Sequence, residues 1–109
     1  MVKVAVLGVT GRMGRAIVRA LHETGDAVLS GALASAGSAA LGRDAGDLAG
    51  TGPVGVEVVA DRERALDGAQ VAIDFTLPRA AVANLEVCER RGVPLVIGTT
   101  GLDEAAQAG

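Results

Sequence analysis

The segment that most constrains the fold is VKVAVLGVTGRMG at residues 2–14, where an apolar strand leads through three glycines into a helix. Gly8 can adopt backbone angles that a Cβ forbids, and Gly11 lets the backbone approach a ligand closely. Gly14 allows the helix to pack tightly on the sheet. This G-x-x-G-x-x-G spacing is a variant of the fingerprint whose helix N-terminus holds a pyrophosphate. Arg12, between two of the glycines, adds positive charge at that point.

The rest of the chain alternates strand and helix patterns. Apolar residues at helical spacing predict the buried face of the first helix, which Gly25 ends; they are Met13, Ala16, Ile17, Ala20 and Leu21. Further strands are predicted at 27–34, 56–60, 70–75 and 93–97. The alternation predicts an α/β fold of Rossmann type, a doubly wound parallel sheet with ligands at the carboxyl ends of its strands.

Two more helices and one long loop complete the predicted elements. Asp61 can cap a short helix that ends at Leu66. A longer helix at 78–91 begins with a proline and ends at Gly92, and its predicted buried residues are Ala81, Val82, Leu85 and Cys88. Residues 35–55 are dense in Gly, Ala and Ser without clear periodicity, so we expect a long surface loop that covers a ligand.

Composition limits the classes of function. The 109 residues fit one domain, and a net charge of −3 argues against a nucleic-acid partner. Cys88 is the only cysteine, which excludes an internal disulfide and a cysteine metal cluster and predicts a cytoplasmic protein. The apolar stretches are far shorter than the roughly 20 residues of a membrane span, and no signal-peptide layout opens the chain, so we expect no membrane association.

Several polar residues have a plain structural interpretation. His22 is expected on the exposed face of its helix, and Cys88 is expected to pack in the core. Asp74 is expected to hydrogen-bond the turn after its strand rather than contact a cofactor. Asp44 and Asp47 are expected to be solvated loop carboxylates, because they provide too few ligands for a metal ion.

Four segments together resemble a known family. In order they are GVTGRMG at 8–14, GRDAGDLAG at 42–50, IDFTLP at 73–78 and VIGTTG at 96–101. In order and spacing they closely resemble the nucleotide-binding half of bacterial dihydrodipicolinate reductase, also called 4-hydroxy-tetrahydrodipicolinate reductase. The resemblance covers essentially the whole chain. It implies that residues 1–109 form a dinucleotide-binding domain.

The resemblance also implies which residues bind the nucleotide. In the family the first turn holds the cofactor pyrophosphate, and the matching residues are Gly8, Val9, Thr10, Gly11, Arg12 and Met13. Phe75 and Thr76 match a pair that lies along the cofactor. The turn that contacts the nicotinamide end and borders the substrate is matched by Gly98, Thr99, Thr100 and Gly101. Thr99 and Thr100 are suited to cap the next helix as well.

The end of the second strand departs from the usual dinucleotide pattern. An acidic residue about 20 positions after the glycines normally holds the adenosine ribose, but this chain has Ala34 and Ser35 there. Without a carboxylate, a 2′-phosphate meets no repulsion; Ser35 or Ser38 can donate to it, and Arg43 is a more distant cation. We therefore expect NADPH or NADH as the cofactor, with NADPH favoured.

The resemblance implies hydride transfer to dihydrodipicolinate, giving tetrahydrodipicolinate in lysine and diaminopimelate biosynthesis. The family's proton-donating histidine and substrate-binding lysine lie in a C-terminal domain, so we expect no catalytic residue in this chain. That domain would bind the small dicarboxylate substrate and set the oligomeric state, expected to be a homo-oligomer. We expect the chain to be a truncated, inactive part of the enzyme. The alternative is a non-catalytic module that binds a nucleotide or coenzyme A.

Overall fold

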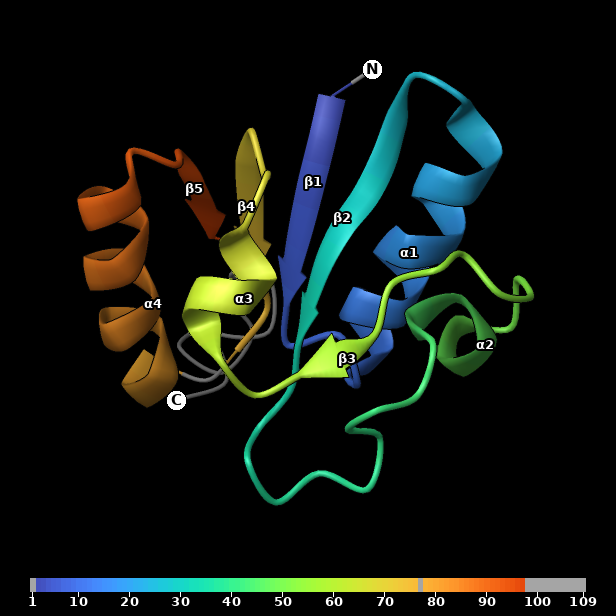
Figure 1. The fold of residues 1–109 in the computed structure, drawn as a ribbon, viewed down its shortest axis with the longest axis horizontal. Coiled ribbons are helices and arrows are strands. Elements are labelled where there is room, and N and C mark those ends of the chain that lie inside the picture. Colours follow the sequence, from blue (N-terminus) through green and yellow to red (C-terminus); the bar gives the residue numbers. More distant parts are fainter. Residues whose placement is uncertain (1, 77, 98–109) are drawn as a thin grey trace, which may run out of the picture.

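The computed structural model of the chain describes residues 2–76 and 78–97. The elements in chain order are β1 (Val2–Leu7), α1 (Arg12–Thr24), β2 (Ala27–Leu33), α2 (Ala45–Ala49), β3 (Val58–Val59), α3 (Arg62–Leu66), β4 (Val71–Asp74), α4 (Pro78–Arg91) and β5 (Leu95–Ile97). The strands in this part of the chain form one parallel sheet in the order β3-β2-β1-β4-β5 (Figure 1). This arrangement confirms the predicted doubly wound α/β fold.

The central strand β1 is buried on both faces from Val4 to Leu7. Successive side chains of a strand point to opposite sides of the sheet, and each side is covered by helices. Val4 and Val6 pack in a core with residues of α1 and α2. Ala5 and Leu7 pack in a second core with residues of α3 and α4. Figure 1 shows the same division, with α1 and α2 on one side of the sheet and α3 and α4 on the other. A nearly continuous apolar strand is therefore what this position requires.

Helix α1 turns a slightly rotated version of the predicted face to the sheet. Ala16, Ile17 and Leu21 are half-buried as predicted, whereas Met13 is 44% exposed and Ala20 is exposed too. Gly14 and Val18, which the spacing did not select, are the buried residues of the helix. The reason lies at Gly14, where an added Cβ would be 2.3 Å from the carbonyl oxygen of Gly8. The backbone of the helix rests directly on the turn there, which confirms the packing role predicted for this glycine.

Helix α4 matches its predicted face only in part. Cys88 is buried and Ala81 is half-buried as predicted, but Leu85 is 41% exposed and Val82 is 62% exposed, and the polar Asn84 is buried. Asn84 is fully enclosed because its amide is satisfied by polar groups at the end of β4. A hydrophobic pattern cannot anticipate this, since it assigns asparagine to the solvent side.

The segment 35–55 is not the irregular loop that its composition predicted. It contains α2, with Ala45 and Ala49 in the core, and α2 contacts α1. The Asp44 carboxylate caps α2 and accepts from four backbone N–H groups, those of Gly46, Asp47, Val54 and Gly55. These hydrogen bonds, the one from Val54 foremost, hold the pKa of Asp44 below its usual value of 3.8. The prediction of a solvated loop carboxylate is therefore wrong for Asp44, whereas Asp47 is exposed.

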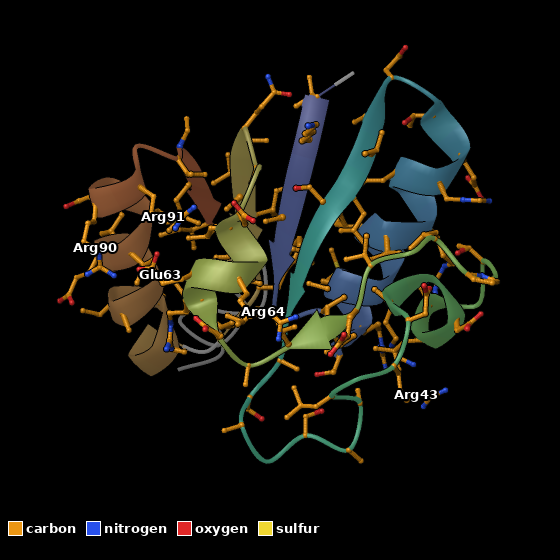
Figure 2. All side chains as sticks on the ribbon, viewed as in Figure 1. Arg43, Glu63, Arg64, Arg90 and Arg91 are labelled. Carbon is orange, nitrogen blue, oxygen red and sulfur yellow. The ribbon has the colours of Figure 1, made fainter. Side chains whose placement is uncertain are left out.

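Helices α3 and α4 are joined by ion pairs on the surface. Figure 2 shows Glu63 of α3 directed toward Arg90 and Arg91 of α4, and its carboxylate pairs with both guanidinium groups. The hydrogen bond from Arg90 contributes most to holding the pKa of Glu63 below its ordinary value. The predicted cap of α3 is confirmed as well, because Asp61 accepts from the N–H of Glu63 at 2.9 Å.

Candidate functional site

A cleft of about 580 Å³ opens at the carboxyl ends of the strands. Its lining residues are Gly8, Thr10, Gly11, Leu33, Ala34, Ser35, Ala36, Ala60, Arg62, Phe75, Thr76 and Ala80. The chain runs outward from β1 to β2 and β3 on one side, then returns to place β4 and β5 on the other. In open α/β sheets ligands bind at the point where the strand order reverses in this way.

The turn after β1 is fitted against the turn after β4. Gly8 has a φ of +87°, and a Cβ there would lie 3.1 Å from the carbonyl carbon of Phe75 and 3.2 Å from the nitrogen of Thr76. The N–H of Phe75 donates to the carbonyl oxygen of Leu7 at 2.8 Å. Two of the three turns that the family resemblance implies bind the nucleotide therefore meet. The third, at Gly98–Gly101, lies outside the described residues.

The N-terminus of α1 differs from those of α2 and α3. Gly11 is its N-cap and has no side chain to accept a hydrogen bond, and its first turn contains no acidic residue. By contrast, Asp44 caps α2 and Asp61 caps α3. Within the described part of the chain, the backbone N–H groups of Arg12, Met13 and Gly14 have no acceptor. A helix start with free donors and no competing carboxylate is suited to an anion.

A buried polar network supports the turn after β4. One Asp74 carboxylate oxygen accepts from the N–H of Thr76 at 2.7 Å and from its hydroxyl at 2.5 Å. The other accepts from the amide nitrogen of Asn84 at 3.0 Å, and this nitrogen also donates to the Thr76 hydroxyl oxygen at 3.1 Å. Asp74 is only 1% exposed. The prediction that Asp74 hydrogen-bonds its own turn is confirmed.

Arg62 was not predicted as a site residue, yet it lines the cleft. It is the first residue of α3, and its Nε donates to the side-chain oxygen of Asn84 at 2.5 Å. No motif marks this arginine, because it reaches the cleft through a short helix that lies about 50 residues after the glycine turn. One weak indication was available, namely that it directly follows an N-cap aspartate shortly after a strand.

The structure brings together about half of the residues predicted to bind the nucleotide. Those that line the cleft are Gly8, Thr10, Gly11, Ala34, Ser35, Phe75 and Thr76. Val9 is buried in the core, and its N–H donates to Leu33. Arg12 and Met13 lie in the first turn of α1 and are exposed, and their contact with a nucleotide stays a prediction. Gly98, Thr99 and Thr100 lie outside the described residues.

Ser38 and Arg43, the other groups considered for a 2′-phosphate, are not among the lining residues. The Ser38 hydroxyl oxygen accepts from the N–H of Ala40 at 3.1 Å. Arg43 is exposed beside α2, as Figure 2 shows. Of the polar groups predicted at the end of β2, Ser35 alone faces the cleft.

Two residues with reactive side chains have the structural roles expected of them. His22 is exposed in the last turn of α1. Cys88 is 1% exposed and belongs to the core under α4. Burial raises the pKa of its thiol above 9.0, and the neighbouring charge of Asp74 raises it further. The thiol is therefore neither accessible nor ionised at neutral pH.

Within residues 2–76 and 78–97, no group of three or more His, Cys, Asp or Glu side chains is arranged to hold a metal ion. None of the helices in the same residues has the length and apolar character that a membrane crossing requires.

The family model and the related proteins that match this chain all belong to one enzyme family. The family model described as "Dihydrodipicolinate reductase, N-terminus" matches residues 2–109. A 4-hydroxy-tetrahydrodipicolinate reductase of Anaeromyxobacter dehalogenans is 51% identical over 108 residues, covering 99% of this chain and 40% of that protein. The enzymes of the same name from Myxococcus xanthus and Saccharophagus degradans are 46% and 44% identical, with 99% and 97% of this chain covered and 41% and 40% of theirs.

The matched region thus spans about 40% of the length of these curated relatives. The similarity extends over the glycine turn, the turn after β4 and the segment between them, which together form the cleft. The chain belongs to the dihydrodipicolinate reductase family and corresponds to the N-terminal part of its members.

Proposed function

We propose that this chain is the NAD(P)H-binding domain of a 4-hydroxy-tetrahydrodipicolinate reductase and that its cleft holds the dinucleotide. The observation that carries the proposal is the start of α1, where three backbone N–H groups lack an acceptor among the described residues and Gly11 leaves them uncapped beside the cleft. The pyrophosphate is the part of the ligand that these donors suit. Membership of the reductase family supports the same assignment.

The chain's own residues would bind and orient the dinucleotide. The turn from Gly8 to Met13 would accept the pyrophosphate, and Phe75 and Thr76 would lie along the nucleotide. The network of Asp74 and Asn84 holds the Thr76 turn in place. A bound nicotinamide supplies the hydride, and in our proposal the remainder of the reductase supplies the substrate-binding and proton-donating groups.

A binding titration tests the cleft. We expect NADPH and NADH to show altered fluorescence on binding, and coenzyme A not to compete with them. Gly11→Val should raise both dissociation constants by about tenfold or more, because a side chain on the turn obstructs close approach of the phosphates. Gly37→Val is the matched control, since a Cβ at Gly37 meets no atom within 4 Å. Binding of coenzyme A without any response to nicotinamide nucleotides would favour the alternative module.

The activity of the whole enzyme is tested in a hybrid. Residues 1–109 would replace the matching N-terminal segment of the Anaeromyxobacter dehalogenans reductase, with which they share 51% identity. We expect the hybrid to oxidise NADPH when dihydrodipicolinate is supplied, and the isolated chain to show no turnover. A folded hybrid that binds NADPH and does not reduce this substrate would refute the assigned reaction.

A preference for NADPH over NADH forms part of the proposal. Ser35 faces the cleft at the end of β2, where a carboxylate would hold the ribose hydroxyls of NADH and repel a 2′-phosphate. Ser35→Asp should therefore weaken NADPH binding by about tenfold or more while leaving NADH binding unchanged or improved. Ser38→Asp, which adds the same charge outside the cleft lining, is the control. An undiminished NADPH preference in Ser35→Asp would show that the end of β2 does not set it.

A further inference from the structure

Among the lining residues that the structure describes, Arg62 is the one charged side chain, and none is a carboxylate. Most of the others are glycine, alanine, leucine or phenylalanine, with the hydroxyls of Ser35, Thr10 and Thr76 as the polar exceptions. A guanidinium in such surroundings attracts an anionic group that enters the cleft, because few other polar groups in the lining interact with its charge.

The buried network fixes the orientation of this arginine. Asn84 is fully buried, and its amide nitrogen is committed to the Asp74 carboxylate and the Thr76 hydroxyl. Its side-chain oxygen therefore has to face the opposite way, where it accepts from Nε of Arg62. The arginine is held by a neutral amide and not by a carboxylate, so its positive charge is not cancelled by this partner.

The two terminal nitrogens of Arg62 remain available. Among the described residues neither has a hydrogen-bond acceptor, although the residue is partly buried. An arginine fixed through Nε that presents its remaining N–H groups to a cleft is suited to phosphate oxygens.

The position of Arg62 indicates which phosphate it would meet. Arg62 follows closely on β3, and the end of β3 is joined to the end of β2 by the hydrogen bond from Ala34 N to the carbonyl oxygen of Val59, at 2.9 Å. The end of β2 is where a dinucleotide fold places the adenosine ribose. The pyrophosphate is already matched to the uncapped start of α1, which lies on the other face of the sheet from α3.

We infer that Arg62 binds the 2′-phosphate of the adenosine moiety and, together with Ser35, makes this domain select NADPH. The inference rests on the proposed function, because it requires the dinucleotide to occupy the cleft. Arg62 would then do from the start of α3 what dinucleotide folds commonly do with an arginine near the end of the second strand. Ser35, which also lines the cleft, would donate to the same group.

The test compares ligands that differ only in the 2′-phosphate. For the unmodified chain we expect 2′,5′-ADP to bind at least about tenfold more tightly than 5′-AMP, as charge-assisted hydrogen bonds to a phosphate require. Arg62→Met keeps the apolar length of the side chain and removes the charge. It should weaken binding of NADPH and 2′,5′-ADP by about tenfold to a hundredfold and change binding of NADH and 5′-AMP by less than about threefold.

Two other variants separate binding from folding. Arg64→Met is the matched control, since Arg64 lies on the same helix (Figure 2) and is exposed. Arg64 lines a different, smaller cavity together with Ser30 and Glu57. The Arg64→Met variant should leave all four affinities unchanged. Arg62→Lys should retain part of the preference for the 2′-phosphate, because it keeps a charge without the planar fork. Melting curves of each variant show whether a loss of binding reflects a loss of folded protein.

The outcomes distinguish this inference from the proposed function. Equal weakening of NADH and NADPH by Arg62→Met would overturn it and would place Arg62 near the pyrophosphate or the adenine ring. If the unmodified chain binds 2′,5′-ADP and 5′-AMP equally well but still binds NADH, the role of Arg62 is overturned and the proposed function is kept. Failure of the unmodified chain to bind any nicotinamide nucleotide would overturn both.

Discussion

The packing of α1 on the glycine turn leads to a quantitative prediction for Gly14→Ala. A Cβ at this position would lie 2.3 Å from the carbonyl oxygen of Gly8 and 2.9 Å from Cα of Val9. Both atoms belong to the backbone, so no side-chain rotation relieves the contact. The start of α1 has to move away from the turn that leaves β1.

The size of the effect follows from these distances. The gap between the Cβ and the Gly8 oxygen has to widen from 2.3 Å to the 3.4 Å of ordinary contact, a shift of about 1.1 Å. Overpacking of a well-packed site typically costs about 1–3 kcal/mol, and a backbone obstacle puts this site near the upper value. Alanine is better than glycine in a helix by about 1 kcal/mol, which offsets part of the cost. We expect Gly14→Ala to lower the free energy of unfolding by about 2 kcal/mol.

The assay is urea and thermal unfolding followed by circular dichroism, with Gly11→Ala as the matched control. A Cβ at Gly11 would lie 3.6 Å from the same oxygen, in ordinary van der Waals contact, and its φ of −74° is accessible to alanine. For a domain of this size, the loss in Gly14→Ala corresponds to a melting temperature lower by about 8–16 °C. Gly11→Ala should stay within about 0.5–1 kcal/mol of the unmodified chain. Equal stability of the two variants would refute the reasoning from close contact.

Two further predictions concern side chains that hydrogen-bond to groups elsewhere in the fold. Asp44→Asn should lower the melting temperature at pH 6, and the difference from the unmodified chain should shrink on acidification. The folded-state pKa of Asp44 lies below 3.8, so the stabilisation by its carboxylate is complete above the unfolded-state pKa. This stabilisation is lost as the pH falls through the folded-state pKa. Melting curves between pH 6 and 3 measure this, and a difference that stays constant with pH would contradict it. Asn84→Ala should lower the free energy of unfolding in urea by about 2–4 kcal/mol, because an Asp74 oxygen loses a buried donor and a void is left. The control is Glu86→Ala on the exposed face of α4, which should change this free energy by less than about 0.5 kcal/mol. If the two α4 variants unfold at the same urea concentration, the buried network does not contribute as described.

The sequence alone determined the class of fold and the location of the phosphate turn. The strand–glycine–helix unit at 2–14 is a local pattern, because the left-handed backbone at Gly8 and the contact of Gly14 with the Gly8 carbonyl oxygen both arise within it. The alternation of strand and helix patterns was enough to predict the parallel sheet, and the short helix after Asp61 could be recognised from its cap. Each of these features depends on residues that are close to it in the sequence.

The spacing of apolar residues failed to predict burial where the hydrophobic signal was weak or where specific packing contacts decided which side chains are buried. The five-residue helix α2 lies in a segment rich in glycine and alanine, where the hydrophobic signal is weak, although its aspartate cap and the left-handed Gly50 mark both ends. The buried faces of α1 and α4 were set by contact with the turn at Gly8 and by the amide of Asn84. Neither influence appears in the periodicity of apolar residues.

The composition of the cleft was decided by the tertiary structure. Arg62 and Asn84 lie 22 residues apart and meet only because α3 and α4 pack on the same face of the sheet. In the sequence Arg62 is one of several arginines near the surface, and Asn84 is a polar residue in the middle of a helix. Chain topology brings them to the carboxyl ends of the strands, and the cost of burying an unpaired amide then fixes which way each one points.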